Sequence, residues 1–131
     1  MNAEPKNNCS GHILMVDDEP LLLQINKRRL EKSGYQITIT TDSQDALGKF
    51  QKTPGKFDLI ITDQTMPGLT GIELAKAVME IKPSMPIIMC TGHSESTPKE
   101  KALSFGVKQY VYKPIQGNEL INAVREVLSQ Q

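Results

Sequence analysis

FDLIITDQTMPGLTG, residues 57–71, is the stretch of sequence that decides the fold. Its apolar run, Leu59–Ile61, is unbroken, which is typical of a central parallel strand that is buried on both faces. The run ends on an acid, Asp63, and the breaker residues at 66–68 then stop the strand and turn the chain. Because ligands of open α/β sheets bind at the carboxyl ends of the strands, we interpret Asp63 as a reactive side chain.

Strand-like and helix-like segments alternate five times along the chain. The expected strands are residues 13–16, 36–40, 59–63, 86–90 and 107–112, and the expected helices are about 20–33, 42–54, 71–82, 97–106 and 118–128. The links between these segments are short. The pattern predicts an α/β fold, a doubly wound five-stranded parallel sheet with helices on both faces and right-handed crossovers.

The helices carry recognisable signals at their ends and on their faces. Pro20 suits the first turn of the first helix, whose expected buried stripe is Leu22, Ile25 and Leu30, with Leu21 on its flank. Two segments, 70–73 and 97–100, match the capping box that starts a helix. Either Asp42 or Ser43 can cap the second helix.

Composition limits the classes of protein to which the chain can belong. At 131 residues it has the size of one domain, with a polar lead-in at 1–11 and the domain at 12–131. The 15 basic and 15 acidic residues cancel, and no Lys/Arg run is dense enough to bind nucleic acid directly. Cys9 and Cys90 are expected to be free thiols. No segment resembles a signal peptide or a membrane span, so we expect a cytoplasmic protein without membrane insertion.

Five polar side chains fall at the carboxyl ends of the expected strands: Asp17, Asp18, Asp63, Thr91 and Lys113. Two unit charges about 4 Å apart interact by roughly 4 kcal/mol near a protein surface, so three carboxylates there need positive charge among them. Mg²⁺ and the lysine would supply it. Such an arrangement is suited to phosphoryl transfer onto Asp63, with the ammonium and the hydroxyl receiving the new anionic oxygens.

The order of these motifs resembles that of the receiver domains of two-component signalling. The matching segments are Asp17-Asp18, residues 63–68, Thr91-Gly92 and Lys113-Pro114, and the resemblance runs from about His12 onward. It implies the flavodoxin-like strand order 2-1-3-4-5. It also implies a partner, either a histidine kinase or a histidine phosphotransfer domain, that donates a phosphoryl group from its histidine.

The same resemblance implies individual roles. Asp63 would accept the phosphoryl group, and Mg²⁺ would be held by Asp17, Asp18, Asp63 and the backbone carbonyl of Thr65. Lys113 would contact the phosphoryl oxygens, and its peptide bond to the following proline is expected to be cis. The protein would catalyse only its own phosphorylation and dephosphorylation, so it is not expected to be an enzyme in the usual sense.

Further residues of the resemblance concern switching. Thr91 would move toward the phosphoryl group and Tyr110 would turn inward, while Tyr112 is expected on the opposite face of the strand. Thr65 and His93 occupy positions that influence the lifetime of the phosphoryl group. The face formed by Tyr110, the fourth helix and the last helix is where partners, including a second copy of the chain, are expected to bind.

Other interpretations are open. Taken singly, paired aspartates before a helix usually complement its dipole, and Lys113 could be an ordinary solvated lysine. A receiver that is never phosphorylated would act as a scaffold only. A phosphatase of the aspartyl-phosphate type would use Asp63 as nucleophile, but it usually needs an acid where Thr65 stands. A flavin binder would need a phosphate-binding loop after the first strand, and none is present.

Overall fold

A computed structural model describes residues 10–92 and 99–130. The elements in chain order are β1 (His12–Val16), α1 (Pro20–Lys32), β2 (Gln36–Thr40), α2 (Ser43–Lys52), the 3-10 helix η2 (Pro54–Lys56), β3 (Leu59–Asp63), α3 (Gly71–Ile81), β4 (Ile87–Gly92), α4 (Lys99–Ser104), β5 (Gln109–Lys113) and α5 (Glu119–Ser129). The predicted alternation of strands and helices is therefore confirmed. β2 and β3 have the expected bounds, and the bounds of most other elements differ from the expected ones by one to a few residues.

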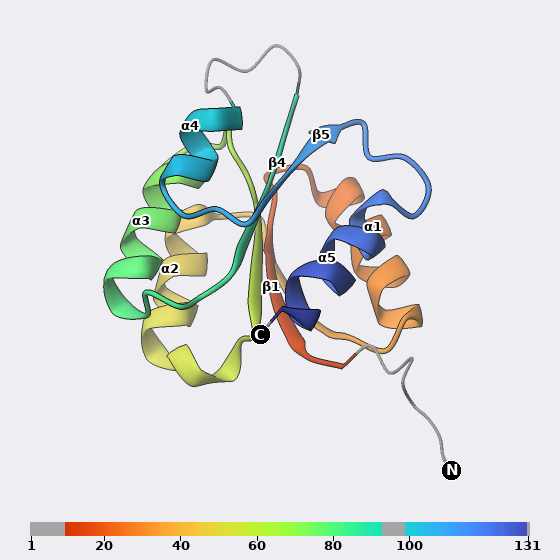
Figure 1. The fold of residues 1–131 in the computed structure, drawn as a ribbon, viewed down its shortest axis with the longest axis horizontal. Coiled ribbons are helices and arrows are strands. Elements are labelled where there is room, and N and C mark those ends of the chain that lie inside the picture. The colour runs from red at the N-terminus through yellow and green to blue at the C-terminus, as the bar shows by residue number, and fades with distance from the viewer. Residues whose placement is uncertain (1–9, 93–98, 131) are drawn as a thin grey trace.

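The five strands form one parallel sheet in the order β2-β1-β3-β4-β5, as the resemblance implies. Helices α2, α3 and α4 cover one face and α1 and α5 cover the other (Figure 1). At the carboxyl edge, Val16 pairs with Thr62 and Asp63 pairs with Cys90, so the ends of β1, β3 and β4 lie side by side. Lys113 at the end of β5 pairs with Gly92.

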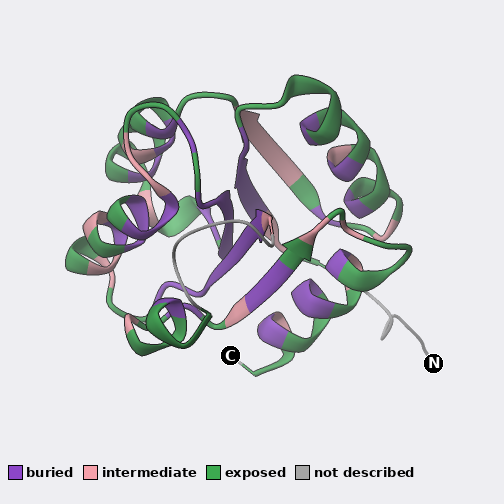
Figure 2. Cartoon of the chain, turned by 90° about the horizontal axis from the view of Figure 1, so that it is seen from above, coloured by how far each residue is buried: buried purple, intermediate pink, exposed green. Residues whose placement is uncertain are grey.

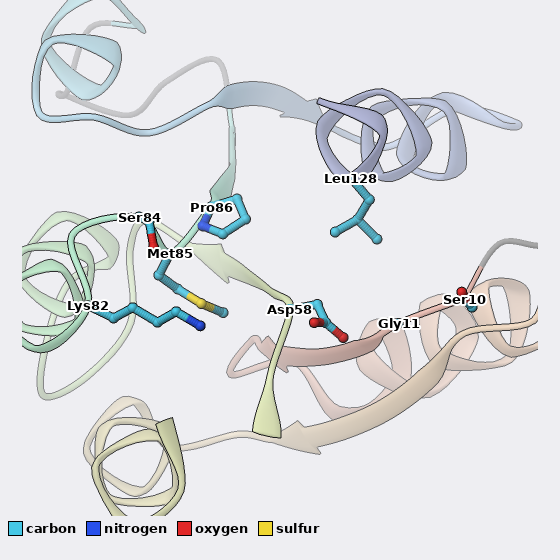
Figure 3. Close-up of a pocket in the computed structure, with 8 residues that line it drawn as sticks. All are labelled: Ser10, Gly11, Asp58, Lys82, Ser84, Met85, Pro86 and Leu128. Carbon is cyan, nitrogen blue, oxygen red and sulfur yellow. The ribbon is translucent and has the colours of Figure 1, made fainter. Parts of the chain in front are cut away.

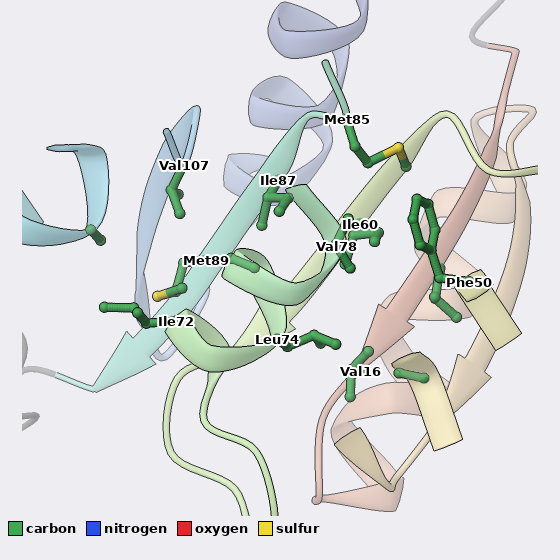
Figure 4. Packing of buried hydrophobic residues seen from close by; sticks show 14 of the residues in the cluster. Val16, Phe50, Ile60, Ile72, Leu74, Val78, Met85, Ile87, Met89 and Val107 are labelled. Carbon is green, nitrogen blue, oxygen red and sulfur yellow. The ribbon is translucent and has the colours of Figure 1, made fainter. Parts of the chain in front are cut away.

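The sheet lies between two hydrophobic clusters because successive strand residues point to opposite faces. In β1, Ile13 and Met15 pack toward α1 and α5, whereas Leu14 and Val16 pack toward α2 and α3. Figure 4 shows the second of these clusters. All five residues of β3 are buried, as predicted for a central strand (Figure 2). The strand that carries Asp63 is thus fixed from both sides.

The predicted buried stripe of α1 is wrong except at Leu30. The buried residues of the helix are Leu23, Asn26 and Leu30. Leu22 is 36% exposed and Ile25 is 47% exposed. Because leucine stands at each of positions 21–23, more than one face of the helix can be read as apolar. The face that is buried includes the polar residue Asn26, which a search for an apolar stripe does not predict.

The capping box of α3 is confirmed. The backbone N–H of Glu73 donates to Thr70 Oγ1 at 3.2 Å, and the backbone N–H of Thr70 donates to Glu73 Oε1 at 2.9 Å. The second expected capping box begins at residues outside the described ranges. Within residues 10–92 and 99–130, no helix combines the length and apolar character needed to cross a lipid bilayer.

Candidate functional site

Three carboxylates meet at the carboxyl edge of the sheet. Asp17 and Asp18 directly follow β1, and Asp63 ends the neighbouring strand β3. One oxygen of each carboxylate lies within 4.8 Å of an oxygen of the others. Asp17 and Asp63 are each only 7% exposed, whereas Asp18 is exposed. The predicted convergence of these residues is thus observed.

Lys113 reaches this acidic cluster from the end of β5. Its Nζ lies 3.0 Å from Asp17 Oδ2 and 3.3 Å from Asp63 Oδ2. One ammonium therefore pairs with two buried carboxylates. Because Asp18 adds a third carboxylate, two of the three negative charges in the cluster remain uncompensated when all three groups are ionised. A divalent cation is the simplest group that would balance them.

The orientation of both buried carboxylates is fixed by the backbone. The N–H of Glu19 donates to Asp17 Oδ1 at 3.0 Å, and the N–H of Gln64 donates to Asp63 Oδ1 at 3.0 Å. In each case the other oxygen, Oδ2, faces Lys113. Each carboxylate is therefore held by both of its oxygens before any ligand binds.

Burial makes ionisation of the central carboxylate unfavourable. It raises the pKa of Asp63 to about 6; Lys113 acts to lower this pKa, and the negative charge of Asp17 acts to raise it. Burial alone would lower the pKa of Lys113, but its hydrogen bond to Asp17 and the charges of Asp17 and Asp63 together raise it. The lysine is therefore a permanent cation, and Asp63 titrates close to neutral pH.

The donor set fits Mg²⁺. Mg²⁺ prefers oxygen ligands, uses one or two carboxylates and keeps several waters. Ligand oxygens of an octahedral Mg²⁺ are about 3 Å apart when adjacent and about 4.2 Å apart when opposite, so three oxygens within 4.8 Å of one another would draw closer together to bind it. The exposed carboxylate of Asp18 leaves one side of the cluster open to water.

The remaining predicted residues lie around this centre. Thr91 is fully buried on β4, one residue beyond Cys90, which pairs with Asp63. Thr65 is exposed on the loop that leaves β3. The Lys113–Pro114 peptide bond is cis, as predicted. His93 lies outside the described residues.

With this geometry, comparison with known proteins assigns the family. The family model of the response regulator receiver domain matches residues 13–125. This chain belongs to that family. The receiver domain is 35% identical over 116 residues to the alkaline phosphatase synthesis transcriptional regulatory protein PhoP of Bacillus subtilis, covering 88% of this chain and 48% of PhoP. It is 30% identical over 120 residues to the transcriptional regulatory protein GlrR of Escherichia coli, covering 92% of this chain and 27% of GlrR.

Solved structures agree with this assignment. A response regulator receiver domain protein from Clostridium thermocellum is 30% identical and superposes with a TM-score of 0.86, covering 91% of this chain and 94% of that one. The response regulator protein TrrA from Thermotoga maritima, solved in complex with Mg²⁺-BeF, is 34% identical with a TM-score of 0.78, covering 88% and 97%. The receiver domain spans about half or less of the two regulators named above.

The two tyrosines of β5 correct one prediction about this receiver domain. Tyr110 is buried and Tyr112 is 36% exposed, but their rings lie 5.4 Å apart in an edge-to-face contact. Residues i and i+2 of a strand point to the same face, so the expectation of opposite faces was wrong. Tyr110 is already directed inward in this structure.

Three residues that position the loop between β3 and α3, residues 64–70, were missed by the sequence analysis. Ser43, fully buried, donates from Oγ to the carbonyl of Pro67 at 3.2 Å and accepts from the N–H of Leu69 at 2.8 Å. Gln64 Oε1 accepts from the N–H of Ile72 at 2.9 Å. These contacts join segments far apart in sequence or depend on loop geometry, so no local pattern predicts them.

Gly71 is the third missed residue, and it lies where α3 starts. A Cβ at this position would be 2.5 Å from the carbonyl oxygen of Asp63 and 3.0 Å from the Cα of Gln64. Only glycine therefore allows α3 to begin directly against the backbone of Asp63 and Gln64. The sequence analysis treated this glycine as part of the capping box alone.

A larger hollow lies at the opposite edge of the sheet, about 370 Å³ in volume (Figure 3). It is lined by residues at the amino ends of the strands and at the ends of two helices: Ser10, Gly11, Asp58, Lys82, Ser84, Met85, Pro86 and Leu128. None of the predicted site residues borders it. Size alone therefore does not locate the acidic cluster.

Proposed function

We propose that this receiver domain, residues 12–131, accepts a phosphoryl group on Asp63 from a phosphohistidine of a histidine kinase or a histidine phosphotransfer domain. The observation that carries the proposal is the contact of the Lys113 ammonium with two buried carboxylates, 3.0 Å from Asp17 and 3.3 Å from Asp63. A buried carboxylate that is ionised near neutral pH beside a fixed cation is suited to act as a nucleophile toward phosphorus.

The proposed transfer exchanges one bond to phosphorus for another. A carboxylate oxygen of Asp63 attacks phosphorus, the new O–P bond forms as the P–N bond to histidine breaks, and the electron pair stays on the imidazole nitrogen, which then takes a proton. Later, water attacks the phosphorus, inorganic phosphate leaves, and the carboxylate is restored. The chain returns to its starting state only by losing its own phosphoryl group, so it acts as a signalling switch.

Asp17, Asp18, Asp63 and the backbone carbonyl of Thr65 would hold Mg²⁺. The ion would neutralise part of the charge on the phosphoryl oxygens. The Mg²⁺-BeF complex of TrrA supports this choice of metal. Lys113, freed from part of its pairing with Asp63 when that carboxylate is esterified, would donate to a phosphoryl oxygen.

Thr91 and Tyr110 would transmit the change. The hydroxyl of Thr91, which now makes a long 3.5 Å contact with the carbonyl of Gly92, would donate to the phosphoryl group instead. The shift of β4 would alter the packing around Tyr110 and thus the surface of α4, β5 and α5, where a partner or a second copy would bind. Thr65 and His93 would tune the phosphoryl lifetime. We place the protein in the cytoplasm, with no direct contact to nucleic acid and no membrane insertion.

Acetyl phosphate tests the proposal without knowledge of the partner. The wild-type protein is incubated with acetyl phosphate and Mg²⁺, and intact mass spectrometry measures the phosphorylated fraction. Asp63→Asn should abolish the phosphorylated species. Asp58→Asn, the same change at the amino end of the same strand, should retain it. A wild-type protein that gains no base-labile phosphate would leave the scaffold interpretation in place.

A further inference from the structure

The buried face of α1 carries one polar side chain with no protein partner in the described structure. Asn26 is 9% exposed and lies between Leu23 and Leu30 on the face that packs against the sheet. Its side-chain amide makes no hydrogen bond with any residue in the ranges 10–92 and 99–130. A buried amide without a hydrogen-bond partner destabilises the folded state, so its presence in Asn26 needs an explanation.

Asn26 faces a small cavity directly beneath the acidic cluster. The cavity measures about 10 Å³ and is lined by residues of β1, α1, β3, β4 and the segment around α5: Met15, Val16, Asp17, Asn26, Ile61, Thr62, Asp63, Cys90, Ile115 and Leu120. This is roughly the space that one water needs, and a buried water also needs two or more polar partners. Apolar cavities stay empty, whereas this one is bordered by an amide and two carboxylates.

Asp17 has hydrogen-bonding capacity to spare. An ionised carboxylate offers about four acceptor positions. Asp17 uses two of them, one for the N–H of Glu19 and one for the ammonium of Lys113. The amide of Asn26 has two N–H donors and a carbonyl acceptor. One water in the cavity can accept from this amide and donate to the carboxylate of Asp17, which gives each group a hydrogen-bond partner in the cavity.

We propose that Asn26 is a positioning residue that acts on Asp17 through one buried water. The proposal rests on the proposed role of Asp17 in binding Mg²⁺. The amide would fix the water, and the water would fix the carboxylate of Asp17 in addition to the contacts with Glu19 and Lys113. Partners of metal-binding side chains typically change metal affinity by about 10- to 100-fold when they are removed.

Asn26→Leu tests the proposal because leucine has a similar volume and no polar atom. We expect the Mg²⁺ dissociation constant to rise on the order of tenfold, measured by a Mg²⁺ titration followed through the backbone amide resonances of residues 63 and 64. Gln24→Leu makes the same type of change on the exposed face of the same helix and should leave the constant unchanged. An Asn26→Leu protein that is folded and binds Mg²⁺ as the wild type does would overturn the proposal.

The water is tested independently of any variant. A crystal structure of the wild-type protein at a resolution that defines ordered water should show one water within hydrogen-bonding distance of both Asn26 and Asp17. An empty cavity would overturn the proposal even if Asn26→Leu failed to fold. Neither measurement involves phosphorylation, so a wild type that binds Mg²⁺ but takes no phosphate would count against the proposed function and leave the role of Asn26 standing.

Discussion

Asp63 lies where burial disfavours the ionised form of its carboxyl group. Its pKa rises from about 3.8 to about 6 on folding, chiefly because of burial. Between these two values the folded protein binds more protons than the unfolded chain, so its stability falls as pH rises through 6. A residue kept for stability would show the opposite shift, so the fold bears a cost at Asp63, which agrees with the reactive role proposed for it.

This shift predicts the behaviour of Asp63→Asn in the absence of metal. At pH 7 the variant should be more stable than the wild type by about 2–3 kcal/mol, because the amide carries no charge to bury. The advantage should shrink as pH falls and vanish below pH 4, where the carboxyl group is protonated in both states. Urea unfolding in EDTA between pH 4 and pH 7.5 measures it. An advantage that Asp58→Asn also shows, or that is constant with pH, would contradict this explanation.

The close approach at Gly71 predicts a second effect at the scale of a residue. Gly71→Ala places a methyl group 2.5 Å from the carbonyl oxygen of Asp63, so the start of α3 must shift. We expect a loss of about 1–3 kcal/mol in the free energy of unfolding and weaker phosphorylation by acetyl phosphate. Gly48→Ala is the matched control. It lies within α2 with nothing within 4 Å of the new methyl group, so it should stabilise by roughly 0.5–1 kcal/mol. Equal effects from the two changes would rule out the steric explanation.

At the scale of elements, α1 shows where sequence patterns reach their limit. The helix and its proline start were predicted correctly because both signals are local. The buried face was not, because the choice between adjacent leucines is made by packing against the sheet, and that packing accepts Asn26 in place of Ile25. Ser43 is a similar case: it suits a helix cap, but Asp42 provides the cap and Ser43 binds the loop between β3 and α3.

The corrected face of α1 predicts unequal effects of similar truncations. Leu23→Ala should lower the free energy of unfolding by about 2–5 kcal/mol, since Leu23 is 1% exposed in the core. Ile25→Ala should change it by no more than about 0.5 kcal/mol, since Ile25 is 47% exposed. Urea unfolding at constant pH provides both values. A larger loss of stability for Ile25→Ala than for Leu23→Ala would show that Ile25 lies on the buried face, as the sequence pattern predicts.

For the whole molecule, most of the site could be predicted because a parallel sheet allows few alternatives. Alternating strands and helices place every strand end on one edge, so Asp17, Asp63 and Lys113 had to meet there. The strand order came from the resemblance to receiver domains. The cavity beside Asn26 and the contacts of Ser43 could not be foreseen, because each depends on distances between elements that no local pattern encodes.

Because the acidic cluster joins the ends of β1 and β3, and Lys113 ties it to β5, Mg²⁺ should stabilise the receiver domain as a whole. An ion that binds only the folded state adds RT ln(1 + [Mg²⁺]/Kd) to its stability, about 1.4 kcal/mol at a concentration ten times Kd. Thermal unfolding at pH 7 should therefore shift upward with MgCl₂ and return with EDTA, and Asp17→Asn should abolish most of the shift. NaCl at matched ionic strength screens the carboxylates without bridging them, so it should give a smaller change. If NaCl reproduced the full shift, the cluster would be responding to ionic strength, and a specific divalent site would be excluded.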